Sequence, residues 1–448
     1  MDPACGDMRR IKVGLLGCGT VGRGVASILL ENRELISRRL GAELVLAKVA
    51  DINEEAVRDL NLPAGVYTGD AMSVVDDPDI PIVVELIGGS TVARELVLAA
   101  LARGKSVTTA NKALIAAHGR EIFEAVAGNG GDFMYEASVG GCMPVIRTLR
   151  ESLVANRVES IFGILNGTCN YILSKITHEG ITFEEALAEA QENGFAEADP
   201  SMDVDGVDAL HKLAICMTIA YGAHVDYRDI FVEGIRHVTP LDIAFAARFN
   251  YQVKLLAISK DHDGRIEGRV HPTMVPEGGI IAGVHGAMNA VMLTGDRVGD
   301  TVLYGQGAGM MPTGSAVVSD LVDLARNILS GAKKRVPVYS FQRGCIADVE
   351  LMPMDEVRTR YYIRVAAEDR PGVLSRLSGV LGDNDISIHS AYQQGRRTGG
   401  PVSVVMLTHK AREADVQKAL SAMEGLDVVS EKPVLIRIED AADEDEAG

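Results

Sequence analysis

Closely spaced cysteines, runs of basic residues and long apolar segments are all missing from this 448-residue sequence. Its six cysteines form no CxxC pair, so we expect no zinc site and reduced thiols, as in a cytosolic protein. Lys and Arg number 44 against 62 Asp and Glu, which disfavours nucleic acids and anionic membranes as partners. Without the roughly 20 apolar residues of a membrane span, the chain is expected to be soluble and cytoplasmic.

A glycine-rich turn follows the first apolar run. In IKVGLLGCGTVGRG, Gly17, Gly19 and Gly22 have the GxGxxG spacing, with a predicted strand before them and a predicted helix after them. The first glycine permits a tight turn, the second lets backbone approach a pyrophosphate, and the third lets helix pack on strand. The pattern indicates a nucleotide site; an ordinary glycine-rich turn is the alternative.

The first part of the chain alternates predicted strands with amphipathic helices, as in a doubly wound parallel sheet. The predicted strands are IKVGLLG, ELVLAKVAD, PIVVELIG, KSVTTAN and DFMYEASV. Asp51 ends the second strand, where a dinucleotide fold places an acidic residue against the adenosine ribose. A helix N-cap explains Asp51 equally well. A second domain is expected after about Glu159, and the amphipathic helix within 305–329 could return to cap the first domain.

Charged residues gather in GFAEADPSMDVDGVDALHKLAI. On a helix starting near Gly206, Asp208 and Lys212 lie one turn apart on one face, so the carboxylate can hold the ammonium. A solvated surface ion pair is the alternative. Glu197 lies upstream, where it could bind a cationic group of a substrate. Lys112 follows a predicted parallel strand, at the sheet edge where ligands bind. Together these groups could polarise and protonate a carbonyl beside a nicotinamide.

Seven segments occur in the order typical of homoserine dehydrogenases, and the chain resembles that family from Lys12 to Ile438. The segments are GLLGCGTVGRG, VVELIGG, VTTANKALIAAHG, EASVGG, GILNGTCNYIL, GFAEADPSMDVDGVDALHKLAI and YGQGAGMMPTGSAVVSDL. The resemblance implies interconversion of L-aspartate 4-semialdehyde and L-homoserine with NAD or NADP, in the biosynthesis of threonine, methionine and isoleucine. It also implies a homodimer or homotetramer.

We expect an α/β protein with three domains. A Rossmann-type dinucleotide-binding domain would cover 8–137 and be completed by 305–340. An α+β catalytic and dimerisation domain would cover 138–304. The segment YIRVAAEDRPGVLSRLSGVLGDNDISIHSAYQQ resembles the ferredoxin-like ACT ligand-sensing domain, expected at 355–438, and the acidic tail 439–448 is expected to be disordered.

The resemblance assigns roles to the charged residues. Lys212 would donate a proton to the aldehyde oxygen as hydride reaches its carbon, and Lys112 would line the same cleft, near the cofactor or the substrate. Glu197 and Asp208 would bind homoserine, with carboxylates matching its ammonium group. This agrees with the chemistry, because a developing alkoxide needs a positioned acid.

Gly167 and Thr168 could meet the substrate carboxylate, or form only a structural turn. Phe195 stands where many members have tyrosine, and Met310 replaces a glycine; we expect activity to survive both changes. The expected cofactor contacts are Gly17, Gly19, Thr20, Val21, Gly22, Asp51, Lys112, Gly194 and Gly307.

The resemblance also implies a monovalent cation, usually sodium, on Glu136 and on the backbone carbonyls of Val139, Gly141 and Met143. Such hard oxygen ligands suit the ion. The loop reads EASVGGCMP where EASVAGGIP is usual, so Cys142 replaces a glycine and would strain the loop if that position needs a positive φ.

Cofactor choice depends on the residue before Asp51. Members that use NADP commonly have arginine or lysine there, whereas this chain has Ala50. A 2′-phosphate would meet the carboxylate without a basic partner, so we expect NAD to be accepted at least as well as NADP. Lys48 or Arg23 could compensate.

Two other functions compete with this interpretation. One is a non-catalytic amino-acid sensor with a vestigial dinucleotide fold, and the other is an amino-acid dehydrogenase that releases ammonia. The presence of both lysines and both carboxylates argues against the sensor. Because the pathway ends in threonine, we expect threonine to bind between paired ACT domains, near the turn at Pro371 and Gly372, and to lower activity.

Overall fold

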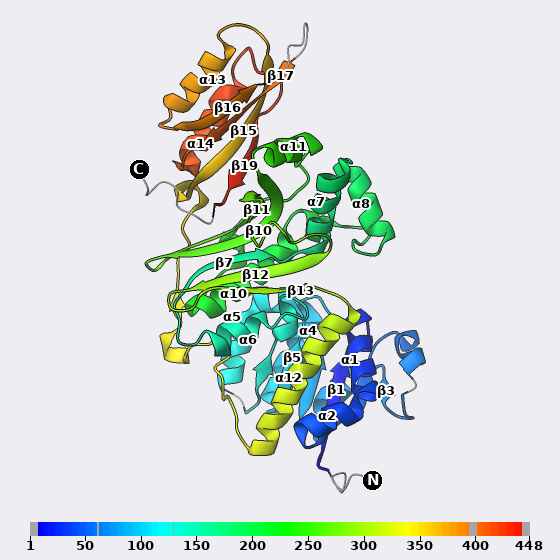
Figure 1. Ribbon diagram of the computed structural model, residues 1–448. Helices are drawn as coiled ribbons and strands as arrows, with labels where there is room; N and C mark the ends of the chain where they lie inside the picture. The colour runs from blue at the N-terminus through cyan, green and yellow to red at the C-terminus, as the bar shows by residue number, and fades with distance from the viewer. Residues whose placement is uncertain (1–7, 61, 129, 394–400, 441–448) are drawn as a thin grey trace. The chain divides into compact units, whose positions relative to one another are not determined.

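The computed structural model describes residues 8–60, 62–128, 130–393 and 401–440. They form two compact units (Figure 1). The first unit takes its residues from Met1–Gly167, Asp208–Ile230 and Met288–Val349, and the second from Thr168–Val207, Phe231–Ala287 and Glu350–Gly448. Residues 441–448 of the expected acidic tail lie outside the described residues.

The first unit contains a six-stranded sheet in the order β3-β2-β1-β4-β5-β6, and every pairing is parallel, which confirms the predicted Rossmann-type fold. The strands form because short apolar runs are buried on both faces, as parallel sheets require. Strand order reverses between β1 and β4, which is where such sheets bind ligands. The strands are β1 (Arg10–Leu16), β2 (Glu43–Ala50), β3 (Tyr67–Thr68), β4 (Ile82–Glu85), β5 (Ser106–Thr109) and β6 (Phe133–Met134).

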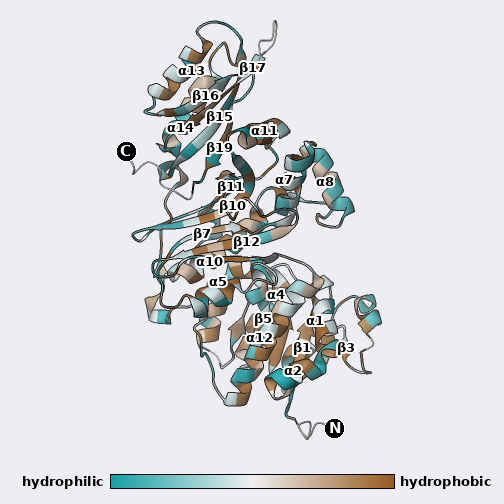
Figure 2. Cartoon of the chain, viewed as in Figure 1, coloured by the Kyte–Doolittle hydropathy of each residue, from teal (hydrophilic) through white to brown (hydrophobic). Residues whose placement is uncertain are grey.

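Helices cover this sheet, and one of them comes from far along the chain. Val317 and Leu321 of α12 (Met310–Ser330) share a core with Val13, Leu15 and Val25. Figure 1 shows α12 beside α1, and Figure 2 shows β1 in the brown of apolar residues and α2 in the teal of polar ones. The other helices are α1 (Thr20–Glu31), α2 (Arg33–Leu40), α3 (Ala71–Asp76), α4 (Thr91–Ala102) and α5 (Lys112–Gly128).

The predicted strand DFMYEASV is mostly wrong. Only Phe133–Met134 pair with β5, and a 3-10 turn, η2 (Glu136–Ser138), follows at once. The chain turns because the Glu136 N–H donates to Asp320 of α12, while the Ser138 hydroxyl donates to the Tyr135 carbonyl.

The remainder of the first unit includes an antiparallel ribbon in which β12 pairs with both β7 and β13. A two-stranded parallel pair joins β8 to β14. The elements are α6 (Val145–Arg147), η3 (Thr148–Ser152), β7 (Val158–Ile164), α10 (Val207–Tyr221), β8 (Ala223–His224), β12 (Met288–Gly295), β13 (Gly299–Gln306) and β14 (Ala347–Asp348).

The second unit contains a long antiparallel hairpin of β10 (Tyr251–His262) and β11 (Arg265–Pro276). Its two-residue turn, Asp263 and Gly264, has positive φ at both residues, as an Asp-Gly turn favours. The other elements before the C-terminal fold are α7 (Gly167–Glu179), α8 (Phe183–Glu192), α9 (Ser201–Val204), β9 (Phe231–Val232) and α11 (Pro240–Arg248).

The C-terminal part of this unit is a βαββαβ fold with strand order β19-β15-β17-β16, which confirms the ferredoxin-like topology. Its apolar faces form one core, with Tyr361, Leu377 and Met406 fully buried. The elements are β15 (Arg358–Glu368), α13 (Val373–Gly382), β16 (Ile388–Gln393), β17 (Pro401–Thr408), β18 (Ala411–Arg412), α14 (Glu413–Glu424) and β19 (Val434–Ile438).

The residues just after β19 differ from the expected disordered tail. Glu439 is buried, and its carboxylate pairs with Arg269 and, at 2.7 Å, with Lys260. Asp440 pairs with Arg360. The first two acidic residues of the expected tail therefore form specific ion pairs. Among the described residues, no helix is both long and apolar enough to cross a membrane.

Candidate functional site

The three motif glycines have different surroundings. Gly17 has φ +90°, and a Cβ there would lie 2.6 Å from the Leu86 carbonyl carbon. A Cβ on Gly22 would lie 2.2 Å from the Gly17 oxygen, whereas one on Gly19 would meet no atom within 4 Å. The fold itself thus requires the first and third glycines. The second, Gly19, faces open space just before α1, whose first two residues are Thr20 and Val21.

Asp51 serves the turn rather than capping an α-helix. Its Oδ2 accepts a hydrogen bond from the Cys18 N–H at 2.6 Å, and its Oδ1 accepts one from the Asn53 N–H at 2.8 Å. The carboxylate therefore lies directly beside the glycine-rich turn. A contact between Asp51 and a ribose stays a prediction.

The residues considered for cofactor choice differ in accessibility. Ala50 is buried, and Lys48 pairs with Asp77 at 3.0 Å. Arg23 on α1 is partly exposed and pairs with Asp59 at 3.1 Å, and Ile52, the residue after Asp51, is 99% exposed. Both expected compensating residues thus already have an acidic partner.

Two lysines share one aspartate where α5 and α10 begin. Asp208 Oδ2 accepts hydrogen bonds from Lys212 Nζ at 2.7 Å and from the Asn166 amide at 3.0 Å, and its Oδ1 lies 3.1 Å from Lys112 Nζ. Lys212 Nζ also donates to the Leu165 carbonyl at 2.7 Å. Only 9% of the Lys212 side chain and 8% of the Asp208 side chain are exposed, so the alternative of a solvated surface pair is wrong.

The charge of Asp208 is fixed by this environment. Burial alone would raise the pKa of Asp208, but the charges of Lys212 and Lys112 outweigh it and hold that pKa well below its usual range. An anionic Asp208 beside two ammonium groups leaves the cluster with a net positive charge. A carboxylate has about four lone-pair sites, and three donors already contact Asp208. It can therefore accept roughly one more hydrogen bond.

The ends of β4 and β5 hold the start of α5 in place. The Asn111 side chain accepts a hydrogen bond from the Leu114 N–H at 3.1 Å and donates one to the Gly89 carbonyl at 2.6 Å. Glu85 is fully buried, accepts the Thr109 hydroxyl at 2.7 Å, and has a pKa raised by burial. Sequence reasoning missed Glu85, although an acidic residue inside the apolar run PIVVELIG was a signal.

Other predicted substrate residues lie in or next to the second unit. Gly167 begins α7, and the hydroxyl of the next residue, Thr168, donates to the Phe195 carbonyl at 2.6 Å. Gly194 has φ +73° just after α8, and Glu197 is exposed on the following loop. Thr168 thus holds the loop that carries Glu197. The meeting of this loop with the lysine cluster stays a prediction.

Glu136, the predicted cation ligand, is a buried acid. Its two carboxylate oxygens accept the N–H groups of Ile146 at 2.9 Å and Arg147 at 2.8 Å. Burial, with the nearby charge of Asp320, raises the pKa of Glu136 to about 8. A bound cation would offset both effects, so the group fits the implied ion.

The following loop is compatible with that assignment. Val139 and Met143 are buried, and the positive φ angles fall on Gly140 and Gly141, not on Cys142. The strain expected from Cys142 is therefore wrong. A Cβ on Gly141 would lie 2.6 Å from Gly307, so the predicted cation loop and a predicted cofactor contact lie side by side. Within the described ranges, no group of three or more His, Cys, Asp and Glu side chains forms a metal cluster.

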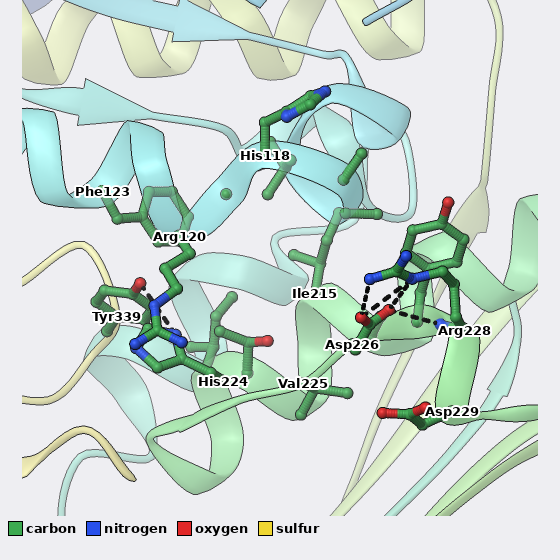
Figure 3. A pocket seen from close by; sticks show the side chains of 18 of the residues that line it. His118, Arg120, Phe123, Ile215, His224, Val225, Asp226, Arg228, Asp229 and Tyr339 are labelled. Atoms are coloured by element: carbon green, nitrogen blue, oxygen red, sulfur yellow. Dashed lines mark hydrogen bonds and ion pairs between the residues drawn. The ribbon is translucent and has the colours of Figure 1, made fainter. Parts of the chain in front are cut away.

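A cavity of about 580 Å³ lies between α5, α10 and the loop 224–229 (Figure 3). His118 and Ile215 line it, and Arg228 on its rim pairs with Asp226. None of the predicted site residues lines this cavity. We therefore treat it as separate from the candidate site.

Comparisons with known proteins cover nearly the whole chain. Residues 17–136 match the family "Homoserine dehydrogenase, NAD binding domain", residues 144–322 match "Homoserine dehydrogenase", and residues 361–428 match "ACT domain".

A homoserine dehydrogenase from Pseudomonas aeruginosa is 43% identical over 433 residues, covering 96% of this chain and 99% of its own. The crystal structure of one from Thiobacillus denitrificans is 46% identical with a TM-score of 0.92, and the match covers 97% of this chain and 99% of that one. The structure of a putative homoserine dehydrogenase from Archaeoglobus fulgidus is 36% identical with a TM-score of 0.64, and the match covers 70% of this chain and 99% of that one.

Proposed function

Because the chain belongs to the homoserine dehydrogenase family of NAD(P)-dependent oxidoreductases, we propose that the Lys112–Asp208–Lys212 cluster is its catalytic centre. The reaction interconverts L-aspartate 4-semialdehyde and L-homoserine. The observation that supports this assignment is a buried carboxylate, Asp208, that holds two ammonium groups, one of them on Lys112 just after the parallel strand β5.

In this proposal Lys212 is the proton donor. Two of its three ammonium protons are directed to Leu165 and Asp208, which leaves one for the substrate oxygen. When bound, the nicotinamide supplies hydride to the aldehyde carbon or accepts it from the alcohol. Lys112 stabilises the negative charge that develops on the same oxygen, and burial strengthens both interactions.

Recognition of the amino acid follows from charge. Glu197 binds the substrate ammonium, with the remaining acceptor site of Asp208 as a second ligand. The substrate carboxylate lies at the N-terminus of α7, near Gly167 and Thr168, where backbone N–H groups and the helix dipole favour anions.

The nicotinamide cofactor is proposed to lie on the glycine-rich turn with Asp51 against the ribose, and NAD is accepted at least as well as NADP. Gly194 and Gly307 complete its contacts. Glu136 and the carbonyls of Val139, Gly141 and Met143 hold a sodium ion, which would place a structural cation beside Gly307.

We further propose that the enzyme is a cytoplasmic homodimer or homotetramer and that threonine, bound between paired ACT domains, lowers its activity. A ligand can do this only if it binds the less active conformation more tightly, and a coupling of about 1–3 kcal/mol is ordinary. The domain matched at 361–428 supports an effector site.

One assay tests the proposal. Purified protein is mixed with NAD or NADP and L-homoserine, L-glutamate or L-leucine, and reduced nicotinamide is followed by absorbance. We expect the enzyme to oxidise homoserine but neither glutamate nor leucine. The rate of homoserine oxidation should fall with millimolar threonine and also when choline replaces sodium. Turnover of glutamate or leucine would favour the ammonia-releasing dehydrogenase, and no turnover would favour the sensor.

A further inference from the structure

The last strand of the ACT-type fold carries a buried arginine with contacts on two sides. Arg437 is 2% exposed, and its Nε and Nη2 donate to the two carboxylate oxygens of Glu413 on α14, at 2.9 and 2.5 Å. Its Nη1 donates to Glu233 at 2.8 Å, and its guanidinium lies over the Phe231 ring, 4.9 Å from the centroid. One side chain thus connects α14 and β19 to the segment 231–236.

The segment 231–236, which we term the relay segment, is anchored along β11. Residues 231–232 form β9 and pair in parallel with β11, and the Glu233 N–H donates to the Val270 carbonyl at 2.8 Å. The first half of the relay segment is thus fixed on β11, and β11 is also the strand that pairs with β19.

The second half of the relay segment packs on the chain that leads into α10. The Ile235 N–H donates to the Val204 carbonyl at 2.8 Å, and a Cβ on Gly234 would lie 2.2 Å from that same oxygen. Arg236 pairs with Asp205 through two of its nitrogens. Backbone touches backbone here, so a displacement of one segment cannot be absorbed by side-chain rotation.

The chain under the relay segment is the start of the catalytic helix. Gly206 has φ +83°, and a Cβ there would meet Val232 at 3.1 Å. Only Val207 separates Gly206 from Asp208, and both Asp208 and Lys212 belong to α10. The turn at Gly206 therefore fixes the start of α10, the helix that carries the proposed proton donor Lys212 and its partner Asp208.

We propose that Glu233 is a positioning residue: through Arg437, it couples the ACT-type fold to the Asp205–Gly206 turn and so sets the placement of Asp208 and Lys212. This inference rests on the proposed function for its catalytic readout. A movement of β19 against α14 would reach the start of α10 through two contacts, Arg437 to Glu233 and Gly234 to Val204, and from there along the chain through Gly206 to Asp208. The effector site would then act on kcat through this route.

The test uses the full-length enzyme with Glu233→Gln, which keeps the shape of a side chain that is 34% exposed but removes its charge. We expect kcat for homoserine to fall about three- to tenfold, the KM for the nicotinamide to stay within twofold, and the unfolding temperature to change little. Threonine binding, measured by calorimetry, should keep its affinity within about threefold, while maximal inhibition falls at least threefold.

Two further variants complete the test: one is a control, and the other shows whether two residues act on the same turn. Lys418→Gln removes an exposed ion pair with Asp415 in the same ACT-type fold and should leave every parameter within twofold. Arg236→Gln, which loosens the relay segment from Asp205, should resemble Glu233→Gln. The double variant should show less than the product of the two single effects, because both act on one turn.

The outcomes separate the inference from the function on which it rests. Unchanged kcat and unchanged maximal inhibition in Glu233→Gln would overturn the inference, as would strictly multiplicative effects in the double variant. If the parent enzyme does not respond to threonine but kcat still falls in Glu233→Gln and Arg236→Gln, the regulatory proposal fails and the positioning role holds. If the parent does not oxidise homoserine, the catalytic assignment itself fails.

Discussion

At the scale of single residues, the proposed chemistry depends on one buried carboxylate that holds two ammonium groups. We expect Lys212→Ala to lower kcat by about 100-fold or more, because the proposed proton donor is lost and Lys112 is left only to stabilise charge on the oxygen. Asp208 would keep Lys112 at 3.1 Å, so the fold should survive. Steady-state kinetics and nicotinamide binding by fluorescence check this, with Lys418→Ala, an exposed lysine, as the control. Turnover near that of the parent would reduce Lys212 to a structural role.

A second buried lysine predicts how stability changes with pH. Lys254 on β10 is 2% exposed and donates to the Val284 carbonyl at 2.5 Å, and burial lowers its pKa to about 8. Between about pH 8 and 10.5 the unfolded chain holds a proton that the folded chain has released, so this residue makes stability rise with pH.

We expect Lys254→Met to remove that rise, worth up to about 3 kcal/mol by linkage, in urea unfolding measured from pH 7 to 10. Lys418→Met should leave the profile unchanged. A parent protein whose stability is flat over this range would contradict the prediction.

Cofactor preference is decided by side chains around Asp51, and exposure indicates which one to change. Ala50 is buried, so Ala50→Arg should destabilise the protein rather than create a phosphate site. Ile52→Arg presents a guanidinium from an exposed position and should raise the NADP to NAD ratio of kcat/KM by about tenfold. An unchanged ratio would show that Ile52 does not face the 2′ position.

At the scale of elements, the β1–α1 turn allows folding and binding to be separated. Gly19→Ala adds a methyl group with no protein atom within 4 Å, at a φ of −69° that alanine accepts, so the unfolding temperature should stay within about 2 °C. Nicotinamide affinity should fall at least tenfold, because a pyrophosphate would meet the methyl group. Gly22→Ala should instead destabilise the fold, since its Cβ would lie 2.2 Å from the Gly17 oxygen. If Gly19→Ala binds normally, the cofactor does not lie on this turn.

Elements with strong local signals were predictable, and those set by distant contacts were not. The sequence predicted β1, β2, β4, β5 and the start of α10, because apolar runs end at turn residues and a helix follows Gly206. It overestimated β6, whose end depends on a hydrogen bond between Glu136 and Asp320, 184 residues apart.

The candidate site was predictable to a similar extent. The pairing of Asp208 with Lys212 follows from helical spacing, whereas the contact with Lys112 needed the parallel-strand argument and the contact with Asn166 needed the fold. Asp51 shows the limit of a local pattern, because one carboxylate bonds both the glycine-rich turn and the Asn53 backbone.

At the scale of the whole molecule, the C-terminal fold is joined to the rest of its unit by buried ion pairs. Asp242 of α11 is fully buried against Arg364 of β15, and Arg269 pairs with Glu439. The role of the C-terminal fold can be tested by truncating the chain after Val349. A cut after Arg343 would also remove β14, which pairs with β8.

We expect the chain ending at Val349 to oxidise homoserine without a threonine response but to be less stable by about 1–3 kcal/mol, because Asp242 and Arg269 lose partners. Asp242→Asn should recover part of the loss in the truncated chain only. Calorimetric unfolding and the homoserine assay measure both properties. A truncated enzyme that is still inhibited by threonine would place the effector site outside the ACT-type fold.

The return of α12 to the first core has a consequence during synthesis on the ribosome. Residues of α12, Val317 and Leu321 among them, complete a core whose members before α12 end at Ala137, so the parallel sheet stays partly uncovered while some 180 residues are still to be made. At about 5–20 residues per second, that interval lasts roughly 10–40 s. For that time the nascent chain exposes apolar strands, and it is then that holding chaperones would bind it.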